Sequence, residues 1–177
     1  MEWEKVKLMQ LISITAMVLL LASSDVNAET AAVGALAPNF ARPLLDDERI
    51  NLSLEDYRGQ VVYLDFWASW CGPCLIAMPK IEALKQRFEG SDFAVLAINV
   101  DRDPKRARRF LNKVEVSYPS VYDATAELPK QYGLQAMPSS YVIDQRGYIT
   151  LVHEGFRKGD EDLLGAHIQE VLNRVRE

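Results

Sequence analysis

The chain has 177 residues, of which 49% are apolar and 25% charged, and this length can bury one ordinary hydrophobic core. Its formal net charge of -5 argues against a general nucleic-acid binder, because such proteins normally carry a basic surplus. The sequence contains no repeat and no low-complexity segment, so we expect a single domain over residues 29–177 behind a short N-terminal tail.

Residues 1–28 have the pattern of a targeting segment. A mostly apolar stretch runs from Leu8 to Ala22, two lysines precede it, and Val26-Asn27-Ala28 offers small residues at a cleavage position. We expect residues 1–28 to be a signal peptide or, if they are not cleaved, a membrane anchor through residues 8–22; a buried core helix is the alternative. Either targeting form would place the domain outside the cytoplasm, where a disulfide can persist.

Short elements are expected at the start of the domain. Pro38 favours an extended backbone at Ala37, and residues 49–52 resemble a short edge strand. Ser53 is a favourable cap for one helical turn, and that turn should end by Gly59.

Two apolar stretches predict buried strands. Residues 61–68 are almost continuously apolar and rich in β-branched and aromatic side chains, which suits a central strand covered on both faces. Residues 93–100 have the same character. The only interruption in the first stretch is Asp65, whose carboxyl group would be buried with its neighbours.

A long amphipathic helix is expected between these two strands. Apolar residues recur at helical spacing from Cys74 to Phe88, and Gly90 is a natural end. The helix should begin near Cys71, and Pro79 inside it should produce a kink, because proline lacks one backbone donor.

The second half of the chain alternates helix and strand. We expect a helix from Pro104 to Lys113, a short one that begins near Pro129 and ends at Gly133, and a last one over residues 160–174. Strands are expected at 120–122, 139–143 and 148–153, with a hairpin turn at 144–147. The order predicts an α/β fold with one mixed sheet covered by helices on both faces.

The only two cysteines, Cys71 and Cys74, have C-x-x-C spacing at a strand-to-helix junction, which indicates thiol-disulfide exchange. Cys71 would be the exposed nucleophile, because the free backbone donors and the positive dipole end of the helix stabilise its thiolate. Cys74, one turn further in, would be the shielded resolving cysteine, and Gly72-Pro73 would keep the ring tight.

A zinc half-site and an inert structural disulfide are the alternatives for this pair. Zinc would need two more ligands, and the histidines His153 and His167 lack the usual spacing, so we expect no metal site. Both histidines are expected to be structural or surface residues.

Several motifs together carry a family resemblance. The segment from Asp65 to Cys74 resembles the active-site segment of thioredoxins, and Met137-Pro138 resembles their cis-proline loop. Five segments together resemble the TlpA-like branch, the extracytoplasmic thioredoxin-fold proteins that include ResA and DsbE. These segments are Ala37-Pro38-Asn39-Phe40, Tyr57-Arg58-Gly59, Phe66 to Cys71, Asn99-Val100-Asp101 and Val142 to Gly147. The resemblance runs from about Gly34 to the C-terminus. It implies a thioredoxin fold with an N-terminal β-hairpin and a central strand-helix insertion at roughly residues 101–122.

Asp65 matches the buried aspartate of thioredoxins, which takes the proton from the resolving cysteine. A buried carboxylate without a partner is costly and responds with a raised pKa, so a role as general base for Cys74 is the hypothesis. An ordinary hydrogen-bonded core acid is the alternative.

Met137-Pro138 is the second functional pair. If the bond between them is cis and lies beside the cysteines, the preceding backbone can pair with a substrate strand; a plain trans turn is the alternative. Met137 would then line a substrate groove with Trp70, Gly72 and Pro73 as its apolar rim.

The chain also departs from the TlpA-like pattern. Members often carry a glutamate three residues after the second cysteine, where this chain has Ala77, and an asparagine where it has Asp65. Some relatives have a narrow role in cytochrome c maturation. Because of these departures, that role is only one candidate for the function of this chain.

One further helix is unusually basic, with Lys105, Arg106, Arg108, Arg109 and Lys113. A solvated face is the expected meaning, and docking to an anionic membrane or to an acidic partner is the alternative.

Together these features predict an extracytoplasmic, periplasmic or membrane-anchored thiol-disulfide oxidoreductase that acts as a monomer. By resemblance it would reduce disulfides of exported proteins, receive electrons from a membrane thiol carrier and need no cofactor beyond the Cys71-Cys74 disulfide. Net oxidation or isomerisation, and a binding or regulatory module that responds to redox state without turnover, are the alternatives.

Overall fold

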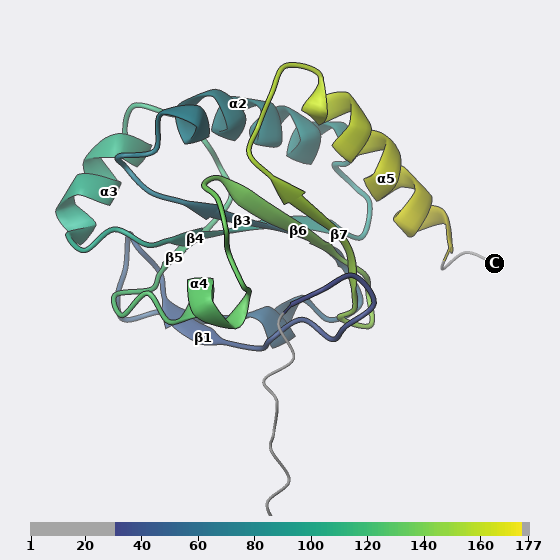
Figure 1. The fold of residues 1–177 in the computed structure, drawn as a ribbon, viewed down its shortest axis with the longest axis horizontal. Coiled ribbons are helices and arrows are strands. Elements are labelled where there is room, and N and C mark those ends of the chain that lie inside the picture. The colour runs from purple at the N-terminus through teal and green to yellow at the C-terminus, as the bar shows by residue number, and fades with distance from the viewer. Residues whose placement is uncertain (1–30, 175–177) are drawn as a thin grey trace, which may run out of the picture.

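The computed structural model describes residues 31–174 (Figure 1). The expected leader over residues 1–28 and the domain boundary at residue 29 lie outside the described residues and stay predictions. No helix among residues 31–174 is both long and apolar enough to cross a lipid bilayer.

A five-stranded mixed sheet forms the centre of the protein. Its strands, in chain order, are β3 (Val61–Trp67), β4 (Phe93–Asn99), β5 (Ser120–Tyr122), β6 (Ser139–Ile143) and β7 (Ile149–Glu154). They lie side by side in the order β5-β4-β3-β6-β7. The first three are parallel, while β6 pairs antiparallel with β3 and β7 antiparallel with β6. The predicted mixed sheet is confirmed, with β3, whose residues are all buried, in the middle.

Helices cover both faces of this sheet (Figure 1). On one face lie α2 (Gly72–Arg87), α3 (Pro104–Leu111) and α5 (Asp160–Arg174); on the other lies α4 (Leu128–Gln131). The starts of α3 and α4 follow the sequence signals, because Asp103 caps α3 in front of Pro104, and Pro129 sits in the first turn of α4. Both helices end slightly earlier than expected, α3 at Leu111 instead of Lys113 and α4 at Gln131 instead of Gly133. Helix α2 continues through Pro79 and ends at Arg87, slightly before the expected stop at Gly90.

The N-terminal hairpin implied by the resemblance is present. Strand β1 (Ala41–Pro43) pairs antiparallel with β2 (Asn51–Ser53) in a separate two-stranded sheet. The expected edge strand therefore pairs locally instead of joining the main sheet. Ser53 then caps the 3₁₀ helix η1 (Leu54–Tyr57), and Asp56 Oδ2 accepts a hydrogen bond from the Ser53 N–H, which forms a complete capping box.

The sheet separates two hydrophobic cores. Because side chains alternate along β3, Tyr63 and Trp67 lie under α2, whereas Leu64 and Phe66 lie on the α4 face. The first core includes both cysteines and buried residues of α5. Asp65 falls between Tyr63 and Trp67 in the alternation, so its carboxyl group points into the cysteine side.

Candidate redox site

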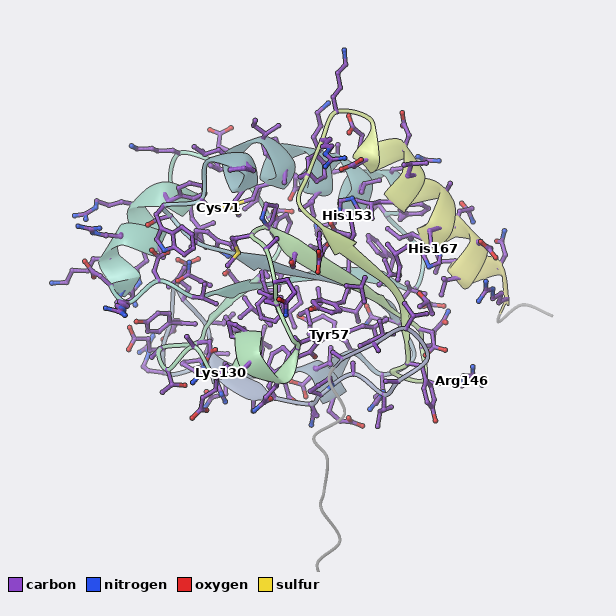
Figure 2. The ribbon with its side chains drawn as sticks, viewed as in Figure 1. Tyr57, Cys71, Lys130, Arg146, His153 and His167 are labelled. Carbon is purple, nitrogen blue, oxygen red and sulfur yellow. A yellow bond between two sulfur atoms is a disulfide. The ribbon has the colours of Figure 1, made fainter. Side chains whose placement is uncertain are left out.

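Cys71 and Cys74 form a disulfide at the start of α2, with an S–S distance of 2.05 Å and a Cα–Cα distance of 5.4 Å (Figure 2). Cys71 is the N-terminal cap of the helix, and its Sγ accepts a hydrogen bond from the Cys74 N–H at 3.2 Å. The same donor would stabilise a Cys71 thiolate after reduction, and the dipole of a 16-residue helix adds to it. The geometry therefore has the features expected of an activated nucleophile.

The expected exposure of Cys71 is only partly met. Cys71 is 4% exposed and Cys74 is 0% exposed, so the order is as predicted but both residues are buried. The neighbouring residues provide the accessible surface: Trp70 is 67% exposed, and Gly72 and Pro73 are exposed as well. These three residues lie where the sequence predicted an apolar rim.

The loop that carries Cys71 is fixed by an aspartate that the sequence interpretation gave no role. Asp101 accepts hydrogen bonds from the Ser69 N–H at 2.8 Å and the Ser69 hydroxyl at 2.7 Å. Asn99 donates to the same carboxylate at 2.8 Å. Asp101 thus ties the end of β4 to the turn before the cysteines, and the Asn99-Val100-Asp101 motif was the only signal for it.

Asp65 is buried, with 1% of its surface exposed, and its Oδ2 has no hydrogen-bond partner among residues 31–174. Burial raises the pKa of the Asp65 carboxyl well above its usual range. The carboxyl group lies in the same core layer as Cys74, on the strand that leads directly to the cysteines.

Two buried tyrosines share this layer and were not predicted as part of the site. The Tyr63 hydroxyl donates to Ser140 Oγ at 2.8 Å, and Ser140 is the residue directly opposite Asp65 on β6. Burial raises the pKa of Tyr63 and of Tyr118, and the negative charge of Asp65 adds to both shifts. The sequence could have indicated Tyr63, because it lies two residues before Asp65 on the same strand and therefore on the same face of the sheet. No sequence signal points to Tyr118.

The Met137-Pro138 peptide bond is cis, as expected from the resemblance, and the trans-turn alternative is wrong. Ser139, the next residue, pairs with Phe66 near the end of β3, so the loop lies beside the segment that leads to Cys71. Met137 is partly buried and contacts both cores. Within the described part of the chain, no hydrogen bond uses its backbone N–H or C=O.

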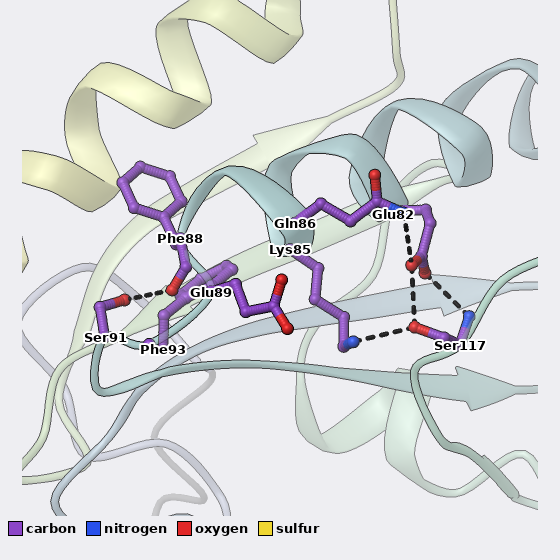
Figure 3. Close-up of a pocket in the computed structure, with 9 residues that line it drawn as sticks. Glu82, Lys85, Gln86, Phe88, Glu89, Ser91, Phe93 and Ser117 are labelled. Atoms are coloured by element: carbon purple, nitrogen blue, oxygen red, sulfur yellow. Dashed lines mark hydrogen bonds between the residues drawn. The ribbon is translucent and has the colours of Figure 1, made fainter.

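The opposite end of α2 has a separate polar cluster (Figure 3). Glu82 accepts hydrogen bonds from the Ser117 N–H and hydroxyl, both at 2.8 Å, and Lys85 donates to the same hydroxyl. Burial opposes ionisation of Glu82, but the Ser117 and Gln86 hydrogen bonds and the Lys85 charge outweigh it and lower the pKa of Glu82. These contacts hold the 101–122 insertion against α2.

Neither histidine contacts the disulfide (Figure 2). His153 Nε2 lies 3.1 Å from Asp160 Oδ2, and His167 Nε2 lies 3.0 Å from Thr150 Oγ1. The described residues contain no group of three or more histidine, cysteine or acidic side chains that could hold a metal ion.

Comparison with known proteins agrees with this geometry. The Redoxin family matches residues 32–167. The thiol-disulfide oxidoreductase ResA of Geobacillus thermodenitrificans is 32% identical over 124 residues, which cover 70% of each chain. ResA of Bacillus thuringiensis is 30% identical over 117 residues, which span 66% of its length and 66% of this chain. Among solved structures, a Chlorobium tepidum protein named thiol:disulfide interchange protein DsbE is 36% identical, with a TM-score of 0.77, and the match covers 81% of this chain and 99% of that chain.

The fold and the cysteine pair define a thioredoxin-fold thiol-disulfide oxidoreductase. The chain belongs to the Redoxin family, and within the thioredoxin superfamily it is of the TlpA-like type.

Proposed function

We propose that this protein reduces disulfide bonds of exported proteins outside the cytoplasm. The observation that carries the proposal is the grouping of three features: the Cys71-Cys74 pair at the N-terminus of α2, the buried Asp65 in the same core layer, and the cis Met137-Pro138 loop beside them. The matched ResA and DsbE proteins, named as thiol-disulfide oxidoreductase and thiol:disulfide interchange protein, support the same chemistry.

The cycle begins with both cysteines reduced. The Cys71 thiolate attacks one sulfur of a partner disulfide, the partner S–S bond breaks, and one partner thiolate leaves and takes up a proton. The Cys74 thiolate then attacks Cys71 Sγ, which releases the second partner sulfur as a thiol. The partner disulfide gains two electrons and two protons, and the Cys71-Cys74 disulfide is formed.

Asp65 would act in the second step. Its carboxylate accepts the proton of the Cys74 thiol, which produces the thiolate that resolves the mixed disulfide. The raised pKa supports this assignment, because a base with a pKa nearer to that of a thiol accepts its proton at lower cost.

The Met137 backbone would bind the substrate. A peptide that runs past Cys71 can form main-chain hydrogen bonds with the unpaired N–H and C=O of Met137, and Trp70, Gly72 and Pro73 would contact its side chains.

The oxidised protein must be reduced again by two electrons. A membrane thiol carrier would supply them to a monomeric domain, with no dissociable cofactor. The targeting pattern of residues 1–28 supports the location, either as a cleaved signal or as an anchor through residues 8–22.

Reduction of insulin by the native protein, with dithiothreitol as the electron source, tests turnover. We expect the native protein to accelerate precipitation of the insulin chains, Cys71→Ser to be inactive, and Cys74→Ser to accumulate a mixed disulfide. An inactive native protein would support the alternative of a binding module without turnover.

Trapping the thiols by alkylation in cells tests the direction of the reaction. A reductase should have Cys71 and Cys74 mostly reduced at steady state. A mostly oxidised pair would overturn this direction in favour of net disulfide formation.

A further inference from the structure

A hollow beside Cys71 combines an apolar wall with several positive charges. We call it the basic groove; it is lined by residues from the start of α2 and from α3, and it has a volume of about 580 Å³. Its lining includes Ser69, Leu75, Arg106, Arg109, Phe110 and Lys113. Ser69 and Leu75 lie on either side of the Cys71-Cys74 ring in the sequence, so an occupant of the basic groove lies next to the disulfide.

The cations of the basic groove have no ionic partner of their own. Arg106, Arg109 and Lys113 are exposed, and no carboxylate within residues 31–174 pairs with them. Arg108 on the same helix differs, because it forms an ion pair with Glu48 and donates to the Leu45 carbonyl. Helix α3 therefore carries one arginine, Arg108, that holds the structure together, and a set of unpaired cations that line the basic groove.

The neighbouring hollow beside Trp70 has a different charge balance. It shares Arg106 with the basic groove and is also lined by Arg102, but Asp101 and Asp103 balance these two charges. Asp101 is occupied by Ser69 and Asn99, and Asp103 caps α3. No acidic side chain lines the basic groove itself. The hollow on the Leu75 side is therefore the one whose lining has cations without acidic side chains.

The floor and wall of the basic groove are well supported. Phe110 stacks on Trp67 with ring centroids 5.2 Å apart, and Trp67 donates to Ser120 Oγ at 2.9 Å. These buried contacts fix α3 against the end of β3, while Leu75 on the opposite wall is 46% exposed. The groove thus offers a preorganised apolar contact beneath its charges, which lowers the cost of binding a peptide.

We propose that the basic groove binds an acidic segment of the partner polypeptide, next to the disulfide that Cys71 attacks. This inference rests on the proposed disulfide-reducing function and names its substrate class. Charge complementarity carries it, because the chain as a whole has a net charge of -5 while this groove holds three unpaired cations. Screening over about 8 Å at physiological salt confines the attraction to residues close to the groove.

An anionic membrane is the competing occupant and fits less well. The occupant must present a disulfide to Cys71, which a peptide lying along the basic groove does directly. A lipid surface that covered the groove would also approach the exposed Trp70 rim and obstruct access to the disulfide.

The test compares three synthetic peptides that share one disulfide loop and differ only in the residues that flank it: Asp and Glu, Asn and Gln, or Lys and Arg. We expect the reduced native protein to react with the acidic peptide about tenfold faster than with the neutral one at low ionic strength, and slowest with the basic one. The preference should fall as salt is added.

A double variant identifies the groove as the source of the preference. Arg106→Gln with Arg109→Gln should reduce the ratio of acidic to neutral rates to about twofold or less. Lys130→Gln with Arg146→Gln removes the same number of exposed charges outside the groove and should keep the native ratio (Figure 2). The ratio cancels any change in the reactivity of the Cys71 thiol, because the same thiol attacks both peptides.

The outcomes separate this inference from the proposed function. If the native protein reduces all three peptides at similar rates, the acidic preference is wrong and the reductase function stands. If it reduces none of them, the proposed function itself fails. If vesicles of anionic phospholipid bind the native protein but not the Arg106/Arg109 variant, and the peptides show no preference, a membrane is the occupant and the inference is overturned.

Discussion

The two faces of the central sheet differ in how they treat buried polar atoms. On the α4 face, Tyr132 donates to the Pro38 carbonyl at 2.7 Å, and Tyr141 donates to the Tyr132 carbonyl at 2.7 Å. On the α2 face, the Asp65 Oδ2 and the His153 Nδ1 have no partner among the described residues. Both faces pair their buried tyrosine hydroxyls, but only the α2 face also keeps a carboxyl oxygen without a partner among the described residues, in the core layer that holds the cysteines.

This difference separates stability from chemistry. Buried polar groups are normally hydrogen-bonded because an unmade bond costs about 1–3 kcal/mol, so the unpaired oxygen of Asp65 marks this carboxyl group as a candidate for chemistry. The aromatic cluster of Phe66, Tyr132 and Tyr141 has no titrating group with an ordinary working pKa, since burial raises the pKa of Tyr141 to about 12. We therefore predict that the α4 face contributes mainly to stability, whereas the α2 face carries the site as well as a hydrophobic core of its own.

The largest expected effect is on stability and comes from Phe66→Ala. Phe66 is 0% exposed and contacts the rings of Tyr132 and Tyr141, with centroids 5.2 and 5.9 Å away. The cavity should lower the free energy of unfolding by about 3–5 kcal/mol, as measured by urea denaturation. Activity per folded molecule should stay within about twofold of the native value. A large loss of activity in the folded fraction would contradict the separation of the two faces.

The next effect is kinetic and comes from Asp65→Asn. Without the base, resolution of the mixed disulfide should be about 10²-fold slower at pH 7 and should lose its dependence on Asp65 ionisation. Stopped-flow measurement of the release of the second thiol from pH 5 to 9 checks both. An unchanged pH profile would leave Asp65 without a catalytic role.

The same variant should change how stability depends on pH. In the native protein the raised pKa lets the folded state keep a proton that the unfolded state has released. The free energy of unfolding therefore falls by about 1.4 kcal/mol per pH unit between the ordinary and the raised pKa of Asp65, and the penalty is absent below the ordinary value. Asp65→Asn lacks this ionisation, so the free energy of unfolding of the variant should exceed that of the native protein by little at pH 4 and by more at pH 8. If urea denaturation gave the same stability difference between variant and native protein at pH 4 and at pH 8, the pKa of Asp65 in the folded state would not be raised.

The smallest expected effect comes from Tyr132→Phe on the α4 face. Loss of the hydroxyl leaves the Pro38 carbonyl without this donor and should cost about 0.5–1.5 kcal/mol of unfolding free energy. Its pH profile of turnover should match that of the native protein. A shifted profile would show that the two faces are coupled through β3.

Much of the fold was predictable because its signals are local. Helix α5 and the strands β5 and β6 have the predicted bounds, since apolar periodicity and turn residues lie within each segment. The predicted bounds of the short strand at residues 49–52 were less accurate, since β2 covers Asn51–Ser53. Its pairing with β1 was implied by the family resemblance alone and not by the composition of the segment. Its pairing depends on a partner strand and not on its own composition.

The sequence alone determined the cysteine pair, its place at a helix N-terminus and the presence of an acid on the buried strand, because spacing and periodicity encode these features directly. Tertiary structure decided the rest. It buried Cys71 beside Trp70, used Asp101 to fix the Ser69 turn, and placed Tyr63 and Tyr118 within range of the Asp65 charge. It also brought the cations of α3 beside Leu75, more than thirty residues earlier in the chain. Contacts between distant segments arise from packing of the sheet and its helices, which no single segment specifies.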